Sequence, residues 1–281
     1  MKYLFSLLTL LLVVAAPLRA ADSESLADRT LGQLVERQKA LLAEEARKGP
    51  GFDADNFQIR MQAVCQSYEV MLRENPHYAA GFASYGYLLG KIGQRKASIV
   101  ILLRANKIDP DIALVKNQIG NFLAEDGRPR EALPYFLAAI KLEPKEPLYH
   151  YQLATLLYVA RDDLIKSGEW TEVALNHTMF EGFKHAADLA PDRLEFTYRY
   201  AEAFYDLDNP DWDAALKAWN NLEARAPSEI ERQTMRLHVI NVLLKQGKTD
   251  HARVLLDSVT EPSLQVQKQK LVAQLPADVE K

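Results

Sequence analysis

The chain has 281 residues, 48% of them hydrophobic, and its 34 basic and 38 acidic residues give a formal net charge of −4. This length and apolar content allow a substantial core, which the chain needs because Cys65 is its only cysteine and no intrachain disulfide can form. The acidic balance argues against nucleic acid or an anionic membrane surface as an electrostatic partner.

The first 20 residues have the pattern of a secretory signal peptide. Lys2 precedes an uncharged, leucine-rich run from Tyr3 to Ala16, and the small residue Ala20 ends the segment. The run is too short for a membrane-spanning helix, which needs about 20 apolar residues. Cleavage near Ala20 leaves 32 basic and 38 acidic residues, a net charge of −6. We therefore expect an exported protein, periplasmic or extracellular, with no integral membrane span after removal of the signal.

Residues 21–76 are expected to form a divergent N-terminal helix pair. Apolar residues recur at intervals of three and four over Leu31–Glu45 and Phe57–Arg73, and the breaking stretch GPGFDAD separates the two runs. Cys65 adjoins the apolar stripe of the second run, which favours a buried, inert thiol over a redox-active or nucleophilic one.

From residue 77 to residue 262 the chain repeats itself with a period near 34 residues. Prolines recur at this spacing, at Pro76, Pro110 and Pro144. Two glycines and an alanine do the same, first as Gly86, Gly93 and Ala105 and again as Gly120, Gly127 and Ala139. The pattern predicts helices near Ala79–Lys91, Arg95–Ile108, Ala113–Glu125 and Pro129–Leu142. In each unit the first glycine allows close approach of the paired helix, and the second allows positive φ in the turn.

This helix–turn–helix unit resembles the tetratricopeptide repeat, whose period is 34 residues. The positions that match its signature are Gly120, Gly127, Ala132, Phe136, Ala139 and Pro144, and in the preceding unit Phe82, Gly86, Gly93, Ala105 and Pro110, with Ser98 in place of a small alanine. The resemblance implies an all-α, right-handed solenoid of five to six antiparallel helix pairs with a C-terminal capping helix.

The predicted repeat units cover residues 79–112, 113–146, 147–193, 194–229 and 230–262, and residues 263–281 are expected to form a capping helix and tail. The third unit carries 13 extra residues, centred on 162–173, because Pro144 and Pro191 are 47 residues apart. Insertions in repeat proteins often carry function, so Trp170 in this segment is a candidate contact residue. The alternative is that the insertion extends a helix and that Trp170 covers the neighbouring unit.

The sequence contains no catalytic arrangement of useful specificity. Its six histidines form no HExxH pattern and no i, i+4 pair, and GxSxG, Walker and GxGxxG patterns do not occur. His185 and Asp188 share a predicted helix face, where a solvated surface pair is favoured over a metal site. We therefore expect no enzymatic activity, no cofactor and no metal.

The resemblance implies that the first helix of each unit lines a concave groove. The side chains expected to face it are Tyr87, Asn117, Gln118, Asn121, Tyr151, Gln152, Thr155, Tyr158, Tyr198, Arg199, Glu202 and Tyr205. Carboxamides carry both a donor and an acceptor, and tyrosine offers apolar area with a polar tip, so this lining suits a peptide segment or partner domain.

Two other interpretations of this lining stay open. The tyrosines pack between adjacent first helices, or Asn117, Gln118 and Asn121 form a solvated face. A clamp for a C-terminal carboxylate, known in the family, is disfavoured because Ala83 and Tyr87 stand where it needs a lysine and an asparagine.

The sequence thus predicts a non-catalytic scaffold or adaptor of the cell envelope that binds a protein or peptide. The alternative is a structural subunit that self-assembles, or joins an envelope or secretion complex, through its convex face or its ends. The pattern indicates neither the partner nor the oligomeric state.

Overall fold

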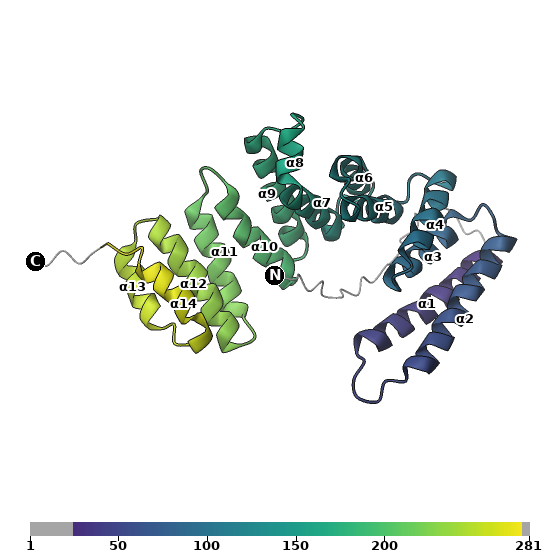
Figure 1. Ribbon diagram of the computed structural model, residues 1–281, viewed down its shortest axis with the longest axis horizontal. Helices are drawn as coiled ribbons and strands as arrows, with labels where there is room; N and C mark the ends of the chain where they lie inside the picture. Colours follow the sequence, from purple (N-terminus) through teal and green to yellow (C-terminus); the bar gives the residue numbers. More distant parts are fainter. Residues whose placement is uncertain (1–24, 277–281) are drawn as a thin grey trace, which may run out of the picture. The chain divides into compact units, whose positions relative to one another are not determined.

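The computed structural model describes residues 25–276, and all regular elements in that range are helical (Figure 1). The predicted signal peptide lies outside the described residues. The helices are α1 (Leu26–Ala46), α2 (Ala54–Glu74), α3 (Ala79–Lys91), α4 (Arg95–Ile108), α5 (Ala113–Glu125), α6 (Pro129–Leu142), α7 (Pro147–Val159), α8 (Arg161–Lys166), α9 (Glu172–Leu189), α10 (Leu194–Ala203), α11 (Trp212–Arg225), α12 (Glu229–Lys245), α13 (Thr249–Asp257) and α14 (Gln265–Val272). Two short 3₁₀ turns, η1 (Phe204–Asp206) and η2 (Pro262–Leu264), complete the set.

The chain divides within α5 into two compact units. Unit 1 ends at Phe122 and unit 2 begins at Leu123. In unit 1, α1 packs on α2, α2 on α3, and α3 on α4. In unit 2, the pairs α7–α9, α10–α11 and α12–α13 pack in succession, and α14 packs on α12 and α13. The predicted helix–turn–helix order is therefore confirmed within both units.

The turns between paired helices use glycine as the repeat pattern predicts. Gly93 and Gly127 have φ of 78° and 73°, in the left-handed region that favours glycine. In each case the following residue donates its N–H to a carbonyl of the preceding helix: Gln94 to Leu89 at 2.8 Å, and Arg128 to Leu123 at 2.9 Å. This bond satisfies carbonyl groups at the end of the first helix and fixes where the second one starts.

Close helix packing explains the mid-helix glycine of the repeat. A Cβ atom on Gly86 would lie 2.7 Å from Cγ of Leu102, which is fully buried on the paired helix α4. Ser98, also on α4, donates its hydroxyl to the Gly86 carbonyl at 2.6 Å. The helices α3 and α4 therefore approach each other through a glycine, a serine and a leucine, as expected from the spacing.

Buried side chains run through each unit. In unit 1, Tyr68 is fully buried and donates its hydroxyl to Oε1 of Gln38 at 2.9 Å. In unit 2, one cluster centres on Phe136, Leu157 and Phe183, and a second on Trp219. Full burial of one such large apolar side chain is worth about 1.5–3 kcal/mol relative to its exposed state.

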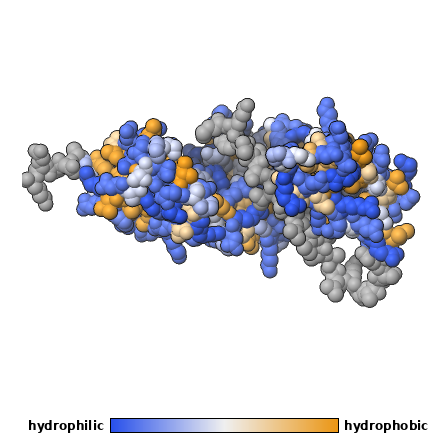
Figure 2. All heavy atoms as spheres, turned by 90° about the horizontal axis from the view of Figure 1, so that it is seen from below, coloured by the Kyte–Doolittle hydropathy of each residue, from blue (hydrophilic) through white to orange (hydrophobic). Residues whose placement is uncertain are grey.

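The face drawn in Figure 2 is mostly hydrophilic, with hydrophobic residues in small separate groups. Among the described residues, no helix combines the length and apolarity that crossing a bilayer requires.

Candidate functional site: a tyrosine- and amide-lined surface

The predicted groove residues of unit 2 lie on α7, α10 and η1, and they form part of what we call the α7–α10–α12 surface. We define this surface as Tyr151, Gln152, Thr155, Tyr158, Tyr198, Arg199, Glu202, Tyr205 and His238. All nine residues are at least partly exposed, and Tyr158, at 43%, is the most exposed of the aromatic side chains on this surface. The structure therefore brings eight predicted residues together with one that the sequence interpretation did not include.

Arg199 joins the helices of this surface. Its guanidinium carbon lies 4.5 Å from the ring centroid of Tyr158 on α7 and 4.7 Å from that of Phe183 on α9. Its Nη1 donates to Oε2 of Glu202 at 2.5 Å, so the charge is balanced within the same helix. Cation–π contacts of this kind are worth about 0.5–2 kcal/mol each and hold the side chain in one conformation.

Two polar groups on this surface have no partner of their own. The Nη2 atom of Arg199 and the Oε1 atom of Gln152 are both buried and make no hydrogen bond within the protein. Leaving a buried donor or acceptor unpaired costs about 1–3 kcal/mol. One unpaired donor and one unpaired acceptor are thus present on neighbouring helices, α10 and α7.

Tyr151 and Thr155 hold the surface together. The Tyr151 ring lies 4.7 Å from that of Phe196 on α10 and 5.6 Å from that of Phe183 on α9. Thr155 donates its hydroxyl to the Tyr151 carbonyl at 2.8 Å. Burial also raises the pKa of the Tyr151 phenol. For this tyrosine, packing between adjacent helices is the interpretation that the contacts support.

A second aromatic group lies where α10, η1, α11 and α12 meet. His238 stacks on the fully buried Trp219, with centroids 3.9 Å apart and an interplanar angle of 5°. The hydroxyls of Tyr198 and Tyr205 lie 3.5 Å from Nε2 and 3.4 Å from Nδ1 of His238. The imidazole is therefore enclosed by three aromatic rings.

The aromatic group is uncharged near neutral pH. Burial lowers the pKa of His238 to about 4, so its imidazole is neutral. Burial likewise raises the pKa values of Tyr198 and Tyr205 to about 12, which keeps both phenols protonated.

The spacing within the repeat could have identified His238 from the sequence. Gln118 precedes the turn glycine Gly127 by nine residues, and His238 precedes the turn glycine Gly247 by the same number. Gly247 has φ of 74°, like Gly93 and Gly127. Counting back from that glycine would have placed His238 on the lined face.

In unit 1 one predicted site residue is misplaced. Asn117 was expected on an exposed face, but it is 0% exposed, and neither polar atom of its side chain has a hydrogen-bond partner. Tyr87, Gln118 and Asn121 are partly exposed. The reason is the helix phase of α5, which buries Asn117 together with Leu114. The expected exposed Asn117–Gln118–Asn121 group is therefore wrong at its first member.

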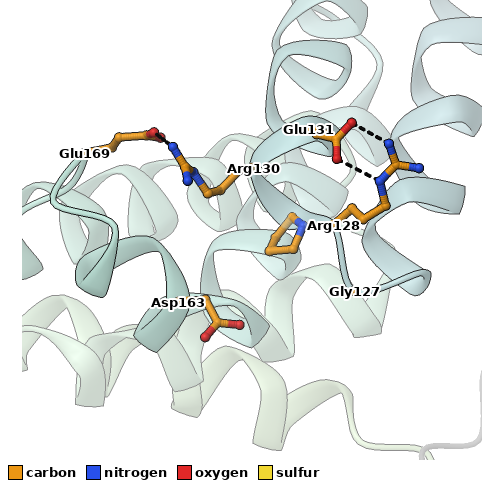
Figure 3. Close-up of a pocket in the computed structure, with 7 residues that line it drawn as sticks. Gly127, Arg128, Arg130, Glu131, Asp163 and Glu169 are labelled. Atoms are coloured by element: carbon orange, nitrogen blue, oxygen red, sulfur yellow. Dashed lines mark hydrogen bonds and ion pairs between the residues drawn. The ribbon is translucent and has the colours of Figure 1, made fainter.

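The insertion forms an extra helix and closes over the neighbouring elements. Helix α8 buries Leu164, and Trp170 packs, half-buried, against the cluster that contains Leu157 and Leu175. An exposed ion pair joins Arg130 on α6 to Glu169 in the loop that follows α8 (Figure 3). Trp170 therefore covers its neighbours, which is the alternative that the sequence left open.

Next to the insertion lies a shallow depression of about 600 Å³. It is lined by Gly127, Arg128, Pro129, Arg130, Glu131, Asp163 and Glu169 (Figure 3). Arg128 pairs with Glu131 at 2.5 Å and Arg130 with Glu169, so its arginines are already neutralised.

Comparisons with known proteins identify the fold. YrrB, described as a tetratricopeptide-repeat protein with an unusual peptide-binding site, is 14% identical with a TM-score of 0.60, over 74% of this chain and 99% of its own. PilF of Pseudomonas aeruginosa is 14% identical with a TM-score of 0.58, over 88% of this chain and 99% of its own. The C-terminal part of a tetratricopeptide-repeat protein of Cytophaga hutchinsonii is 15% identical with a TM-score of 0.54, over 89% and 98%.

These similarities concern the fold alone. No family model and no curated protein matches the sequence. The chain has the all-α, helical-repeat solenoid fold of tetratricopeptide-repeat proteins, and the resemblance drawn from the glycine, alanine and proline spacing is confirmed at that level.

Proposed function

We propose that the chain is a non-catalytic protein–protein interaction scaffold whose α7–α10–α12 surface holds a peptide segment or partner domain. The observation that carries the proposal is the set of partly exposed tyrosine side chains, together with the amide of Gln152, held on packed helices. Nη2 of Arg199 and Oε1 of Gln152 have no hydrogen-bond partner within the protein. The fold is also that of YrrB, a tetratricopeptide-repeat protein with a peptide-binding site.

In the proposed mechanism, packed helices hold the binding side chains in fixed positions before the partner arrives. Arg199 is held between two rings and a carboxylate, and Tyr198 and Tyr205 lie against the Trp219–His238 stack, so these side chains lose little conformational freedom on binding. Tyrosine adds contact area at a low entropic cost. An affinity near micromolar, about −8 kcal/mol, is expected for such a surface.

The proposed place of action is the cell envelope, periplasmic or extracellular. The leucine-rich run over Tyr3–Ala16 and the small residue at Ala20 support this. Mass spectrometry of the protein isolated from the envelope fraction tests it, and the expected mature chain begins near Ala21. An intact N-terminus in the cytosol would contradict export.

Site-specific photocrosslinking in the native host tests the binding surface. A photoreactive amino acid at Tyr158 or Tyr205 is expected to crosslink the same partner segment, identified by mass spectrometry. The control position is Val254 on α13, which is 69% exposed in the same unit. Equal yields from Val254 would contradict the assignment, and crosslinks only to other copies of the chain would favour the self-assembling subunit instead.

A further inference from the structure

One stretch of this acidic chain has the opposite charge. From Pro76 to Ile108 the sequence contains five basic residues and no acidic residue, although acidic residues outnumber basic ones over the whole chain. The stretch forms the α3–α4 pair and the loop before it. The potential near this pair is therefore positive, because salt screens charges that lie more than about 10 Å away.

Helix α4 presents part of this charge on one face. We call the exposed α4 face the set Lys96, Val100, Leu103 and Lys107. These residues follow one another at intervals of four, three and four positions, which places them in one line along the helix. Val100 and Leu103 are 64% and 46% exposed, and both lysines are exposed as well. The opposite side of α4 packs on α3.

The two aliphatic residues of this face are set apart from the other exposed ones. Among the large hydrophobic residues that are exposed in the described part of the chain, Val100 and Leu103 are the only two on one helix that lie three or four positions apart. Single exposed hydrophobic residues are common on protein surfaces, whereas adjoining ones rimmed by polar residues mark interaction sites.

The lysines at the two ends of this pair have no acidic partner within the described residues, since neither forms an ion pair there. The next acidic residue in the sequence, Asp109, accepts the backbone N–H of Asp111 at 2.9 Å in the loop after α4. Arg104 adds a third positive charge beside the face. Its guanidinium carbon lies 4.5 Å from the ring centroid of Phe82, and it donates to the carbonyl of Pro76 at 3.3 Å.

An amphipathic helix with acidic residues complements this arrangement. The lysine positions lie about 16 Å apart along α4, since a helix rises about 1.5 Å per residue. A partner helix that carries two carboxylates about three turns apart, with apolar residues between them, matches both the charges and the aliphatic pair.

An anionic bilayer is a poorer match for the same face. A helix that lies on a bilayer buries a broad apolar face, and the exposed α4 face offers two aliphatic side chains. The acidic excess of the whole chain also opposes approach to an extended anionic surface. It has little effect on a single helix, because charges beyond a Debye length are screened.

We propose that the exposed α4 face docks an acidic amphipathic helix of a partner protein, with carboxylates on Lys96 and Lys107 and apolar residues on Val100 and Leu103. The inference goes beyond the proposed function, because α4 belongs to unit 1 and the α7–α10–α12 surface belongs to unit 2.

Selection from a library of helical peptides tests the proposal. Peptides of about 18 residues, which is five helical turns, are displayed on phage and selected against the immobilised chain from residue 21 to residue 281. Enriched peptides are expected to carry two acidic residues ten or eleven positions apart with apolar residues between them. Synthetic copies should lose affinity about fivefold between about 50 and 300 mM salt, because salt weakens exposed ion pairs.

The double variant Lys96→Gln, Lys107→Gln removes both charges. It is expected to weaken the enriched peptides by about tenfold, the combined effect of two exposed ion pairs. The matched control is Lys217→Gln, Lys270→Gln, which changes the net charge equally at exposed positions of unit 2. This control should leave the affinity unchanged.

The double variant Val100→Gln, Leu103→Gln removes the aliphatic pair and keeps the charges. It is expected to weaken the same peptides by about tenfold, because the apolar contact area is lost. Its control is Val254→Gln, at a position that is 69% exposed on α13. Circular dichroism checks that each variant is folded. A peptide that needs the lysines but not the aliphatic pair would show general attraction of polyanions and overturn the assignment.

The remaining outcomes separate this inference from the proposed function. Failure to obtain any peptide that depends on Lys96 and Lys107 overturns the inference. Peptides that lose affinity in Tyr158→Ala, and not in the lysine variant, overturn it while supporting the α7–α10–α12 surface. Lysine-dependent sedimentation with vesicles of phosphatidylglycerol and phosphatidylethanolamine, without a lysine-dependent peptide, overturns it in favour of a bilayer.

Discussion

At the scale of single residues, Asn117 is where the sequence and the structure differ most. Its neighbour Gln118 is partly exposed, whereas Asn117 is 0% exposed with both polar side-chain atoms unpaired. A helix turns by 100° per residue, so adjacent positions face different surroundings, and a repeat of 34 residues does not specify that phase to within one position. The repeat spacing predicts roughly which face of α5 carries the amide side chains. The packing around α5 decides which of these amides is buried.

Asn117→Leu is expected to stabilise the protein. Leucine has the same number of side-chain heavy atoms as asparagine, branched at the same carbon, and it removes two unpaired polar groups from a buried site, which should add about 1–2 kcal/mol to the free energy of unfolding. Urea denaturation followed by circular dichroism measures this. Asn121→Leu, at a partly exposed position of the same helix, serves as the control and should change stability by less than about 0.5 kcal/mol. A loss of stability in Asn117→Leu would contradict the prediction and indicate a bound partner for the amide.

At the scale of elements, helices α3 to α6 begin and end where the sequence predicts, whereas α8 and η1 were not foreseen. The first four are bounded by proline and by turn glycines such as Gly93 and Gly127, which act locally. By contrast, α10 ends at Ala203 and continues as a 3₁₀ turn that places Tyr205 near His238. No local residue pattern marks that break, so its position depends on tertiary packing.

Gly86→Ala is expected to destabilise the α3–α4 pair. The new Cβ would lie 2.7 Å and 2.8 Å from Cγ and Cδ2 of Leu102, so either that side chain or the helix must move, at a cost of about 1–3 kcal/mol. Thermal unfolding measures the change. Gly32→Ala on α1, where a Cβ meets nothing within 4 Å, provides the control and should gain about 0.5–1 kcal/mol from helix propensity. Similar effects at the two glycines would refute the close-packing argument.

At the scale of the whole molecule, the packing is between elements that are near neighbours in the sequence, as in other repeat proteins. A local change in stability is therefore expected to stay within the unit that contains it. This is a property of the architecture, and the 34-residue spacing was enough to predict it. The location of the aromatic group around His238, which combines residues of four successive elements, required the structure.

The loss of stability caused by protonation of His238 at low pH tests whether a local change stays within one unit. Its pKa in the folded protein is about 4, below the usual 6.5, so the unfolded chain binds the proton first. The resulting stability is complete above pH 6.5 and is lost as the pH falls toward 4; between pH 7 and pH 5 the loss should be about 1–2 kcal/mol. Hydrogen-exchange protection factors are expected to fall over residues 194–272 and not over residues 26–74. His238→Phe should remove this loss, whereas His251→Phe, at an exposed position, should not. An equal fall in both units would contradict local coupling.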